Sequence, residues 1–206
     1  MSQLVVLQGG GAFTANDELD AQILRTHPGY VAVLPTADAF ENPDELVQLS
    51  INWAKRLGAT VKVCSVYTRA DAREQSYADM VSQAGVVYVV GDSPIHLRSV
   101  LKDTVVFDAL AAHPCVVAVA GSASALCDPM IDPRGGAFAL GLGIVKGVAA
   151  ITESEKWPVE RLQRTLLLAN TSLAEVPTGT ALINQSGTWS THGQVVLHGA
   201  LPTFES

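Results

Sequence analysis

Short apolar runs alternate with longer segments of mixed polarity along the first half of the chain. Four runs are continuous and apolar, and each is bounded by turn residues: Leu4–Gln8, Tyr30–Pro35, Val86–Val90 and Cys115–Ala120. Such runs are typical of strands that are covered on both faces of a sheet. A further segment, Thr60–Tyr67, alternates between apolar and polar residues and predicts one more strand.

The segments between these strands have helical patterns. The expected helices run from about Ala15 to Thr26, over Pro43–Leu57 and Asp71–Gln83, and from Pro94 to about His113. Proline is well placed in the first turn of a helix, as at Pro43 and Pro94. Alternation of strands and helices predicts a parallel sheet with right-handed crossovers, in which ligands bind beyond the carboxyl ends of the strands.

The last third of the chain has a different pattern. Asp128–Gly136 is a loop rich in proline and glycine, and Trp157–Asn170 is expected to be helical. Thr180–Asn184 and Gln194–His198 are expected to pair as a β-hairpin around Gln185–His192, covering one sheet edge. Residues 1–206 are therefore expected to form one α/β domain, a three-layer sandwich with a mostly parallel central sheet and a C-terminal antiparallel hairpin.

Composition narrows the range of partners. The chain has 206 residues, 48% of them hydrophobic, and a net charge of −7 without a cluster of Lys or Arg. This charge argues against binding to nucleic acid or to an anionic membrane surface. There is no apolar run of about 18 residues and no signal-peptide pattern, so we expect a cytoplasmic protein. The aliphatic content favours a homodimer.

Cofactor and metal motifs are also missing from the sequence. The three cysteines are expected to be reduced thiols, and neither they nor the scattered histidines have the spacing of metal ligands. Gly9-Gly10-Gly11 lies in a strand-to-helix turn, but no Lys-Ser/Thr pair of a phosphate-binding loop follows it. We therefore expect no cofactor and no metal.

The segment Ala120–Ala125, with sequence AGSASA, follows the fourth of the apolar strands. A nucleophile elbow places its serine on a strained turn between a strand and a helix and needs small residues around it. Ser122 has such neighbours, so it is the candidate nucleophile. A turn with only a structural role fits the same small residues equally well.

Short motifs recur at the ends of the predicted strands and after the elbow; in chain order they are Gly9-Gly10-Gly11, Thr36-Ala37-Asp38, Gly91-Asp92, Ser122-Ala123-Ser124-Ala125, Asp128 to Gly135, Ala139 to Leu142 and Thr180-Ala181-Leu182. This ordered series resembles the motifs of the serine peptidases that include dipeptidase E (aspartyl dipeptidase) and cyanophycinase. The resemblance implies a flavodoxin-like fold of the class I glutamine amidotransferase type. It also implies a peptidase that acts on small or acidic peptides.

The resemblance assigns a role to several residues. Ser122 would attack a peptide carbonyl, backbone N–H groups of Gly91 and Ala123 would stabilise the oxyanion, and Asp128 would orient the general base. Three further residues are candidates for substrate binding. Asp92 lies in the matching Gly-Asp segment, Asp38 (or Glu41) would bind an amine, and Arg134 would hold a carboxylate.

The histidine of this family has no counterpart here. No histidine occurs between His113 and His192, and Ala150 or Thr152 stands where the family's base is expected. Glu153, Glu155, His96, His192 and His198 are the alternatives for that role. Two hypotheses follow, namely a divergent serine peptidase and a non-catalytic protein that binds a peptide-like or carboxylate ligand.

Overall fold

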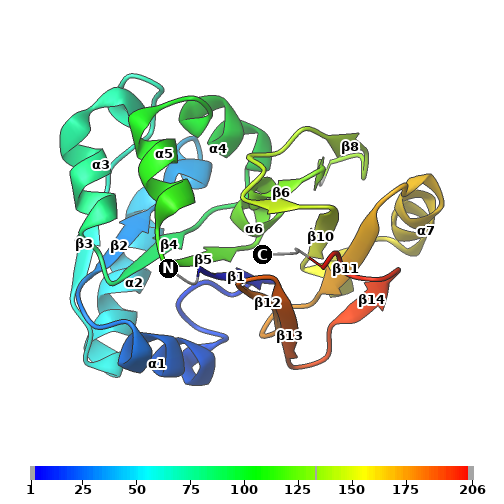
Figure 1. The fold of residues 1–206 in the computed structure, drawn as a ribbon, viewed down its shortest axis with the longest axis horizontal. Coiled ribbons are helices and arrows are strands. Elements are labelled where there is room, and N and C mark those ends of the chain that lie inside the picture. Colours follow the sequence, from blue (N-terminus) through cyan, green and yellow to red (C-terminus); the bar gives the residue numbers. More distant parts are fainter. Residues whose placement is uncertain (1–2, 133, 204–206) are drawn as a thin grey trace.

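A seven-stranded sheet forms the centre of the computed structural model, which describes residues 3–132 and 134–203 (Figure 1). The spatial order of its strands is β13-β12-β1-β5-β4-β2-β3. The five strands from β1 to β3 in this order run parallel, and β12 and β13 continue the sheet in antiparallel fashion. The bounds are β1 (Leu4–Gln8), β2 (Val31–Leu34), β3 (Val61–Val63), β4 (Val86–Val89), β5 (Cys115–Val119), β12 (Ala181–Gln185) and β13 (Thr188–His192).

Helices cover both faces of this sheet, as the continuous apolar strands predict. On one face, α1 (Asp17–Thr26) and α2 (Pro43–Leu57) pack Ile23 and Trp53 against the strands. The other face is covered by α3 (Gln75–Ser82), α4 (Pro94–Leu101), α5 (Val105–Ala112) and α6 (Gly121–Leu126). The expected three-layer α/β architecture is therefore confirmed.

A smaller sheet, with the order β10-β11-β14, lies beside the main one (Figure 1). Its strands are β10 (Val148–Thr152), β11 (Ser172–Val176) and β14 (Val196–His198), and α7 (Val159–Leu168) packs on it through a satellite core. Short paired strands join it to α6, namely β6 (Cys127–Asp128) with β9 (Val145–Lys146) and β7 (Met130–Ile131) with β8 (Phe138–Ala139).

The helix expected over Pro94–His113 consists of two helices. Asp103 has a φ of 58°, and the Thr104 hydroxyl accepts a hydrogen bond from the N–H of Phe107. An N-cap of this kind begins a new helix, so the chain changes direction between α4 and α5.

The C-terminal hairpin exists, but one of its strands was wrongly predicted. β12 pairs with β13 through a two-residue turn in which Ser186 and Gly187 have φ values of 52° and 87°, as hairpin turns of this length require. The segment expected as the second strand instead supplies β14, which pairs with β11 in the smaller sheet. Within the described residues, no helix is both long enough and apolar enough to cross a membrane.

Candidate functional site

The turn from β5 into α6 has the geometry of an elbow, and its strained residue is Ala120. Ala120 has φ 55° and ψ −128°, and the helix begins at the next residue. A positive φ is costly for a residue with a Cβ, and such strain at a strand-to-helix turn is the mark of the nucleophile position in an elbow. The structure therefore places the elbow at Ala120, two residues before the serine that was expected there.

Ser122 lies inside the first turn of α6. Its side chain is fully buried, its hydroxyl donates to the carbonyl oxygen of Gly91 at 3.1 Å, and its backbone N–H donates to the same carbonyl at 3.0 Å. The backbone N–H of Ala123 donates to the carbonyl of Ala120 at 3.0 Å. Ser122 thus holds the β4–α4 loop against the elbow, and the N–H of Ala123 is engaged within the helix.

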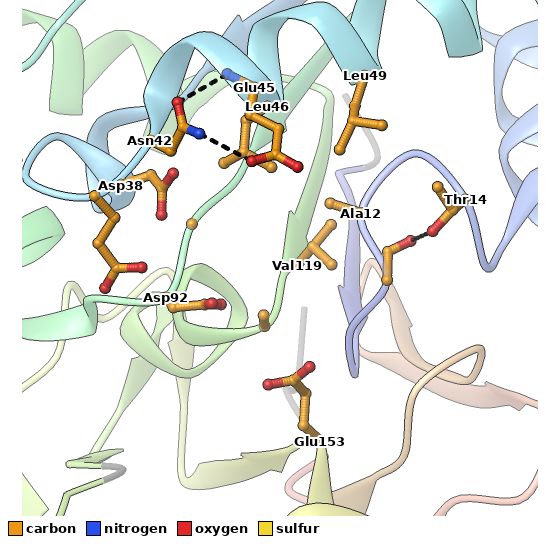
Figure 2. A pocket seen from close by; sticks show the side chains of 14 residues that line it. Ala12, Thr14, Asp38, Asn42, Glu45, Leu46, Leu49, Asp92, Val119 and Glu153 are labelled. Carbon is orange, nitrogen blue, oxygen red and sulfur yellow. Dashed lines mark hydrogen bonds between the residues drawn. The ribbon is translucent and has the colours of Figure 1, made fainter.

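A pocket of about 360 Å³ opens beside Ala120 at the carboxyl ends of the parallel strands (Figure 2). Loops that follow β1, β2 and β4 line it, together with the first turns of α2 and the segment after β10. Ligands of open parallel sheets bind at this rim. The elbow pocket, as we name it, is therefore the candidate functional site.

Carboxylates dominate the polar lining of the elbow pocket. Five acidic residues line it, and no Lys, Arg or His is among the described residues that do so; the five are Asp38, Glu41, Glu45, Asp92 and Glu153. In Figure 2, Glu153 rises from one side of the pocket and faces Asp38 and Glu45 on the other. The site is consequently a region of negative potential.

Two of these carboxyls have perturbed acidity. Burial raises the pKa of Asp38, which is 7% exposed, and the charges of Glu41 and Glu45 raise it further. Partial enclosure raises the pKa of Asp92, to which Glu153 and Asp38 add. Mutual repulsion of this kind means that a bound cation would be stabilised by several groups at once.

Asp92 also lies next to the elbow. The backbone N–H of Gly121, the residue that follows Ala120, lowers the pKa of the Asp92 carboxyl slightly, against the larger effects of burial and of the neighbouring carboxylates. In an elbow hydrolase this N–H belongs to the oxyanion hole. A carboxylate beside that donor opposes the development of a second negative charge at the same place.

Glu153 enters the pocket from the chain after β10. Its backbone is left-handed, with φ 48° and ψ 40°, and its N–H donates to the carbonyl of Gly9 at 3.0 Å. Lys156 binds its Oε1 at 2.5 Å from the outside, where the lysine side chain is 63% exposed. Glu153 is thus fixed between the glycine loop and the elbow.

A second, smaller pocket of about 190 Å³ adjoins the first at the elbow. The two pockets share Asp92 and Glu153, and Gly121 lines the smaller one. Its wall is otherwise largely apolar, formed by Pro94, Ile131, Ala150 and Trp157, with Ser124 and Thr152 as neutral polar residues.

A buried polar network supports the glycine loop from below. The Asp20 carboxylate, 2% exposed, accepts hydrogen bonds from Gln8 Nε2 at 2.7 Å, Trp53 Nε1 at 3.1 Å and the Tyr88 hydroxyl at 3.0 Å. These partners lie on β1, α2 and β4, the elements that carry three walls of the pocket. Burial raises the pKa of Asp20 to about 6, and the negative charge of nearby Asp17 adds to this effect. The three hydrogen bonds act in the opposite direction.

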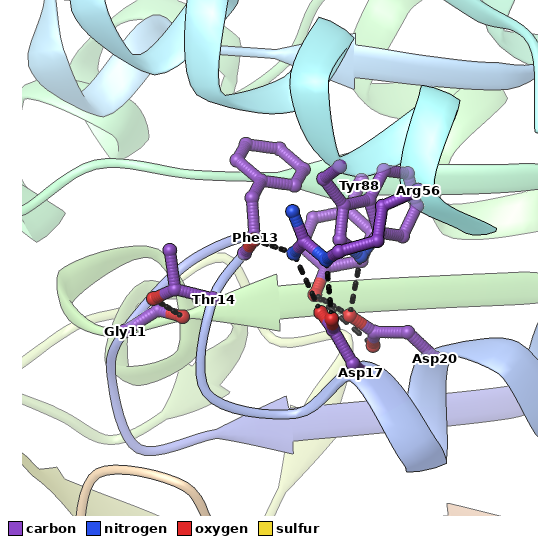
Figure 3. Close-up of polar contacts among 8 residues, drawn as sticks. Gly11, Phe13, Thr14, Asp17, Asp20, Arg56 and Tyr88 are labelled. Carbon is purple, nitrogen blue, oxygen red and sulfur yellow. Dashed lines mark hydrogen bonds and ion pairs between the residues drawn. The ribbon is translucent and has the colours of Figure 1, made fainter.

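The same region fixes the loop after β1 (Figure 3). Arg56 binds both carboxylate oxygens of Asp17 at 2.6 and 2.9 Å and donates to the carbonyl of Phe13 at 2.8 Å. The Phe13 ring packs on Tyr88 and Trp53 with centroid separations of 4.9 and 5.3 Å. The loop that lines the pocket is therefore held by α2.

The other residues expected at the site lie elsewhere or in altered roles. Asp128 lines neither pocket at the elbow, and its Oδ1 accepts the N–H of Gly141 at 3.2 Å. Arg134, 77% exposed, pairs with Asp132 at 3.1 Å, and both line a further pocket of about 430 Å³ that shares Glu41 and Asp92 with the elbow pocket. Asp38, Gly91 and Asp92 do come together, on the wall of the elbow pocket.

The candidate general bases differ in their contacts and in their distance from the elbow pocket. His96 lies 3.1 Å from the carbonyl of Tyr67, His198 pairs with Glu175 at 2.6 Å, and Glu155 binds Thr178. Only Glu153 of the candidates lines the elbow pocket. Across residues 3–132 and 134–203, no group of His, Cys, Asp and Glu side chains is arranged to hold a metal ion.

Comparisons with known proteins place the fold. The sequence matches no family model and no curated protein. A peptidase from an acI-B1 Actinobacterium superimposes with a TM-score of 0.83 at 23% identity, over 99% of this chain and 98% of that one. A protein of Listeria monocytogenes EGD-e, provisionally assigned as Peptidase E, has a TM-score of 0.69 at 13% identity, over 96% and 98%. Along nearly its whole length, the chain is similar in fold to these two proteins.

Proposed function

We propose that this protein binds a small, amine-bearing, peptide-like ligand in the elbow pocket and does not hydrolyse it. The observation that carries the proposal is the alanine at the elbow, enclosed by five carboxylates. A methyl group cannot attack a carbonyl, and the Asp92 carboxyl lies beside the elbow. The pocket thus keeps the shape of an acyl-transfer site without its reacting groups.

The charge of the pocket selects the ligand. A protonated amine makes charge-assisted hydrogen bonds to carboxylates, whereas an acidic peptide would be repelled by them. Arg134, the residue expected to hold a ligand carboxylate, does not line the elbow pocket and pairs with Asp132 in the pocket beside it. An amino group, such as a peptide N-terminus, therefore fits this site better than the acidic peptide expected at first.

Serine-type hydrolysis is the competing function, supported by the fold shared with the two peptidases. A fluorophosphonate probe separates the two functions, because it labels only an activated nucleophile. We expect no labelling of the wild-type protein by mass spectrometry, since the Ser122 hydroxyl is buried and donates to Gly91. Stoichiometric labelling that is lost in Ser122→Ala would establish a hydrolase and overturn the proposal.

Neutralising one wall of the pocket should weaken amine binding. With Gly-Gly amide as the probe, we expect Asp92→Asn to raise the Kd about tenfold, the loss of about 1.4 kcal/mol from a charge-assisted contact. N-acetylation of the probe should have a similar effect, because it removes the ligand's charge. Calorimetric or NMR titration measures both. Glu74→Gln, which neutralises an exposed residue outside the pocket, is the matched control and should leave Kd unchanged.

The pH dependence of binding has a defined sign. The pKa values of Asp38 and Asp92 are raised, so these groups begin to take up protons at a higher pH than ordinary aspartates do. A protonated carboxyl no longer attracts the ammonium. Affinity for Gly-Gly amide should therefore fall as pH is lowered, and the fall should begin at a higher pH than the protonation of an ordinary aspartate would give. An affinity that stays constant until ordinary aspartates protonate would contradict the proposed role of the carboxylates.

A further inference from the structure

The smaller pocket at the elbow differs chemically from the larger one. Ile131 and Ala150 are each 1% exposed, Pro94 is buried, and the Trp157 ring is held by the Arg161 guanidinium at 4.3 Å from its centroid. The Ser124 hydroxyl lies on the same wall, but it already donates to the carbonyl of Ile131 and accepts its N–H, both at 3.2 Å. Most of the wall therefore offers packing surface and not hydrogen bonds.

The position of this pocket relates it to the amine site. Asp92 and Glu153 line both pockets, so an ammonium group bound to these carboxylates lies at the junction. In a peptide the N-terminal amine and the first side chain are attached to the same Cα atom. An N-terminus bound at the junction would thus direct its first side chain into the smaller pocket and the rest of the peptide along the larger one.

We infer that the smaller pocket is a subsite for an apolar N-terminal side chain, so that the ligand is a peptide or amino amide beginning with an aliphatic residue. This inference rests on the proposed function, because it uses the amine to position the side chain. The pocket of about 190 Å³ has room for a side chain of leucine size. Burying an aliphatic side chain of this size favours binding, and partial enclosure supplies a fraction of the effect of full burial.

Three amidated dipeptides test the subsite on the wild-type protein. Leu-Gly amide should bind about tenfold more tightly than Gly-Gly amide, because only the isobutyl group differs. N-acetyl-Leu-Gly amide keeps that group and lacks the charge, so it should bind more weakly than Leu-Gly amide. Equal affinities for Leu-Gly amide and Gly-Gly amide would overturn the subsite while the amine proposal stands.

N-acetyl-Leu-Gly amide tests whether the amine-binding proposal fails while the apolar subsite stands. If it binds as well as Leu-Gly amide does, the apolar subsite stands and the role of the carboxylates is wrong. If none of the three peptides binds, both the proposed function and the subsite are overturned. Each outcome therefore separates the two inferences or rejects them together.

Variants locate the preference within the molecule. Thr152→Leu places an isobutyl group in the smaller pocket. The affinity for Leu-Gly amide relative to that for Gly-Gly amide should therefore fall from about tenfold to about equal. Trp157→Ala removes part of the wall and should lower the ratio as well. Leu167→Ala, at an 87% exposed leucine of α7, is the apolar control and should keep the ratio. A ratio unaltered in both pocket variants would overturn the assignment.

Discussion

Replacing Gly121 by alanine is expected to destabilise the protein by about 3 kcal/mol, because the new methyl group collides with backbone. A Cβ at this position would lie 2.3 Å from the carbonyl oxygen and 2.5 Å from the carbonyl carbon of Asp92. No rotamer change can relieve a contact between a Cβ and a backbone carbonyl. Urea denaturation measures the loss, with Gly135→Ala as the control.

The control isolates the collision from the general effect of adding a methyl group. A Cβ at Gly135 meets no atom within 4 Å, so its free energy of unfolding should change by less than about 0.5 kcal/mol. If the Gly121→Ala variant folds, it should also bind Gly-Gly amide less tightly, because the displaced loop carries Asp92. A Gly121→Ala variant as stable as Gly135→Ala would show that the β4–α4 loop is not packed against the elbow.

The central sheet could be predicted because its information is local. An apolar run such as Val86–Val90 can be buried on both faces only in a covered parallel sheet, and the intervening helical segments determine the crossovers. The local sequence of the strands in the smaller sheet gives a weaker indication of strand structure. Val148–Thr152 and Ser172–Val176 were not predicted as strands, because their pairing depends on partners supplied by distant segments.

The strained residue of the turn, Ala120, lies two residues before Ser122, and local sequence could not show this for a related reason. Any of several positions in the small-residue run AGSASA could form the turn from strand to helix. Ser122 was predicted to occupy it because serine can act as a nucleophile. The turn is set by the end of β5 at Val119, which places Ala120 at the strained position and Ser122 inside the first turn of α6. The local sequence pattern does not determine the end of a strand to within one or two residues.

The acidic lining could be predicted only in part. Asp38, Glu41 and Asp92 follow strands whose carboxyl ends meet at one rim, so the sequence brought them near each other. Glu45 lies in the first turn of α2, where acidic residues are favoured by the helix dipole and give no functional signal. Sequence alone did not show that the two kinds of carboxylate face one cavity.

The polar network beneath the pocket should make stability depend on pH between about 4 and 6. Asp20 has a pKa of about 6 in the folded protein and an ordinary value of 3.8, so the native state binds this proton more tightly than the unfolded chain does. A raised carboxyl pKa contributes stability that is present at pH 4 and below and is lost as pH rises through 6. A shift of this size corresponds to about 3 kcal/mol.

Asp20→Asn removes the titrating group and isolates this contribution. Whatever the substitution costs at a single pH, the difference in free energy of unfolding between wild type and Asp20→Asn should change by about 3 kcal/mol between pH 4 and pH 7, in favour of the variant at the higher pH. Denaturant unfolding at intervals of half a pH unit measures it. Glu18→Gln alters an exposed carboxylate on the same helix and should follow the wild-type profile. A difference that is constant across this range would mean that Asp20 ionises as readily in the folded protein as in the unfolded chain, and that its hydrogen bonds from Gln8, Trp53 and Tyr88 fully offset its burial.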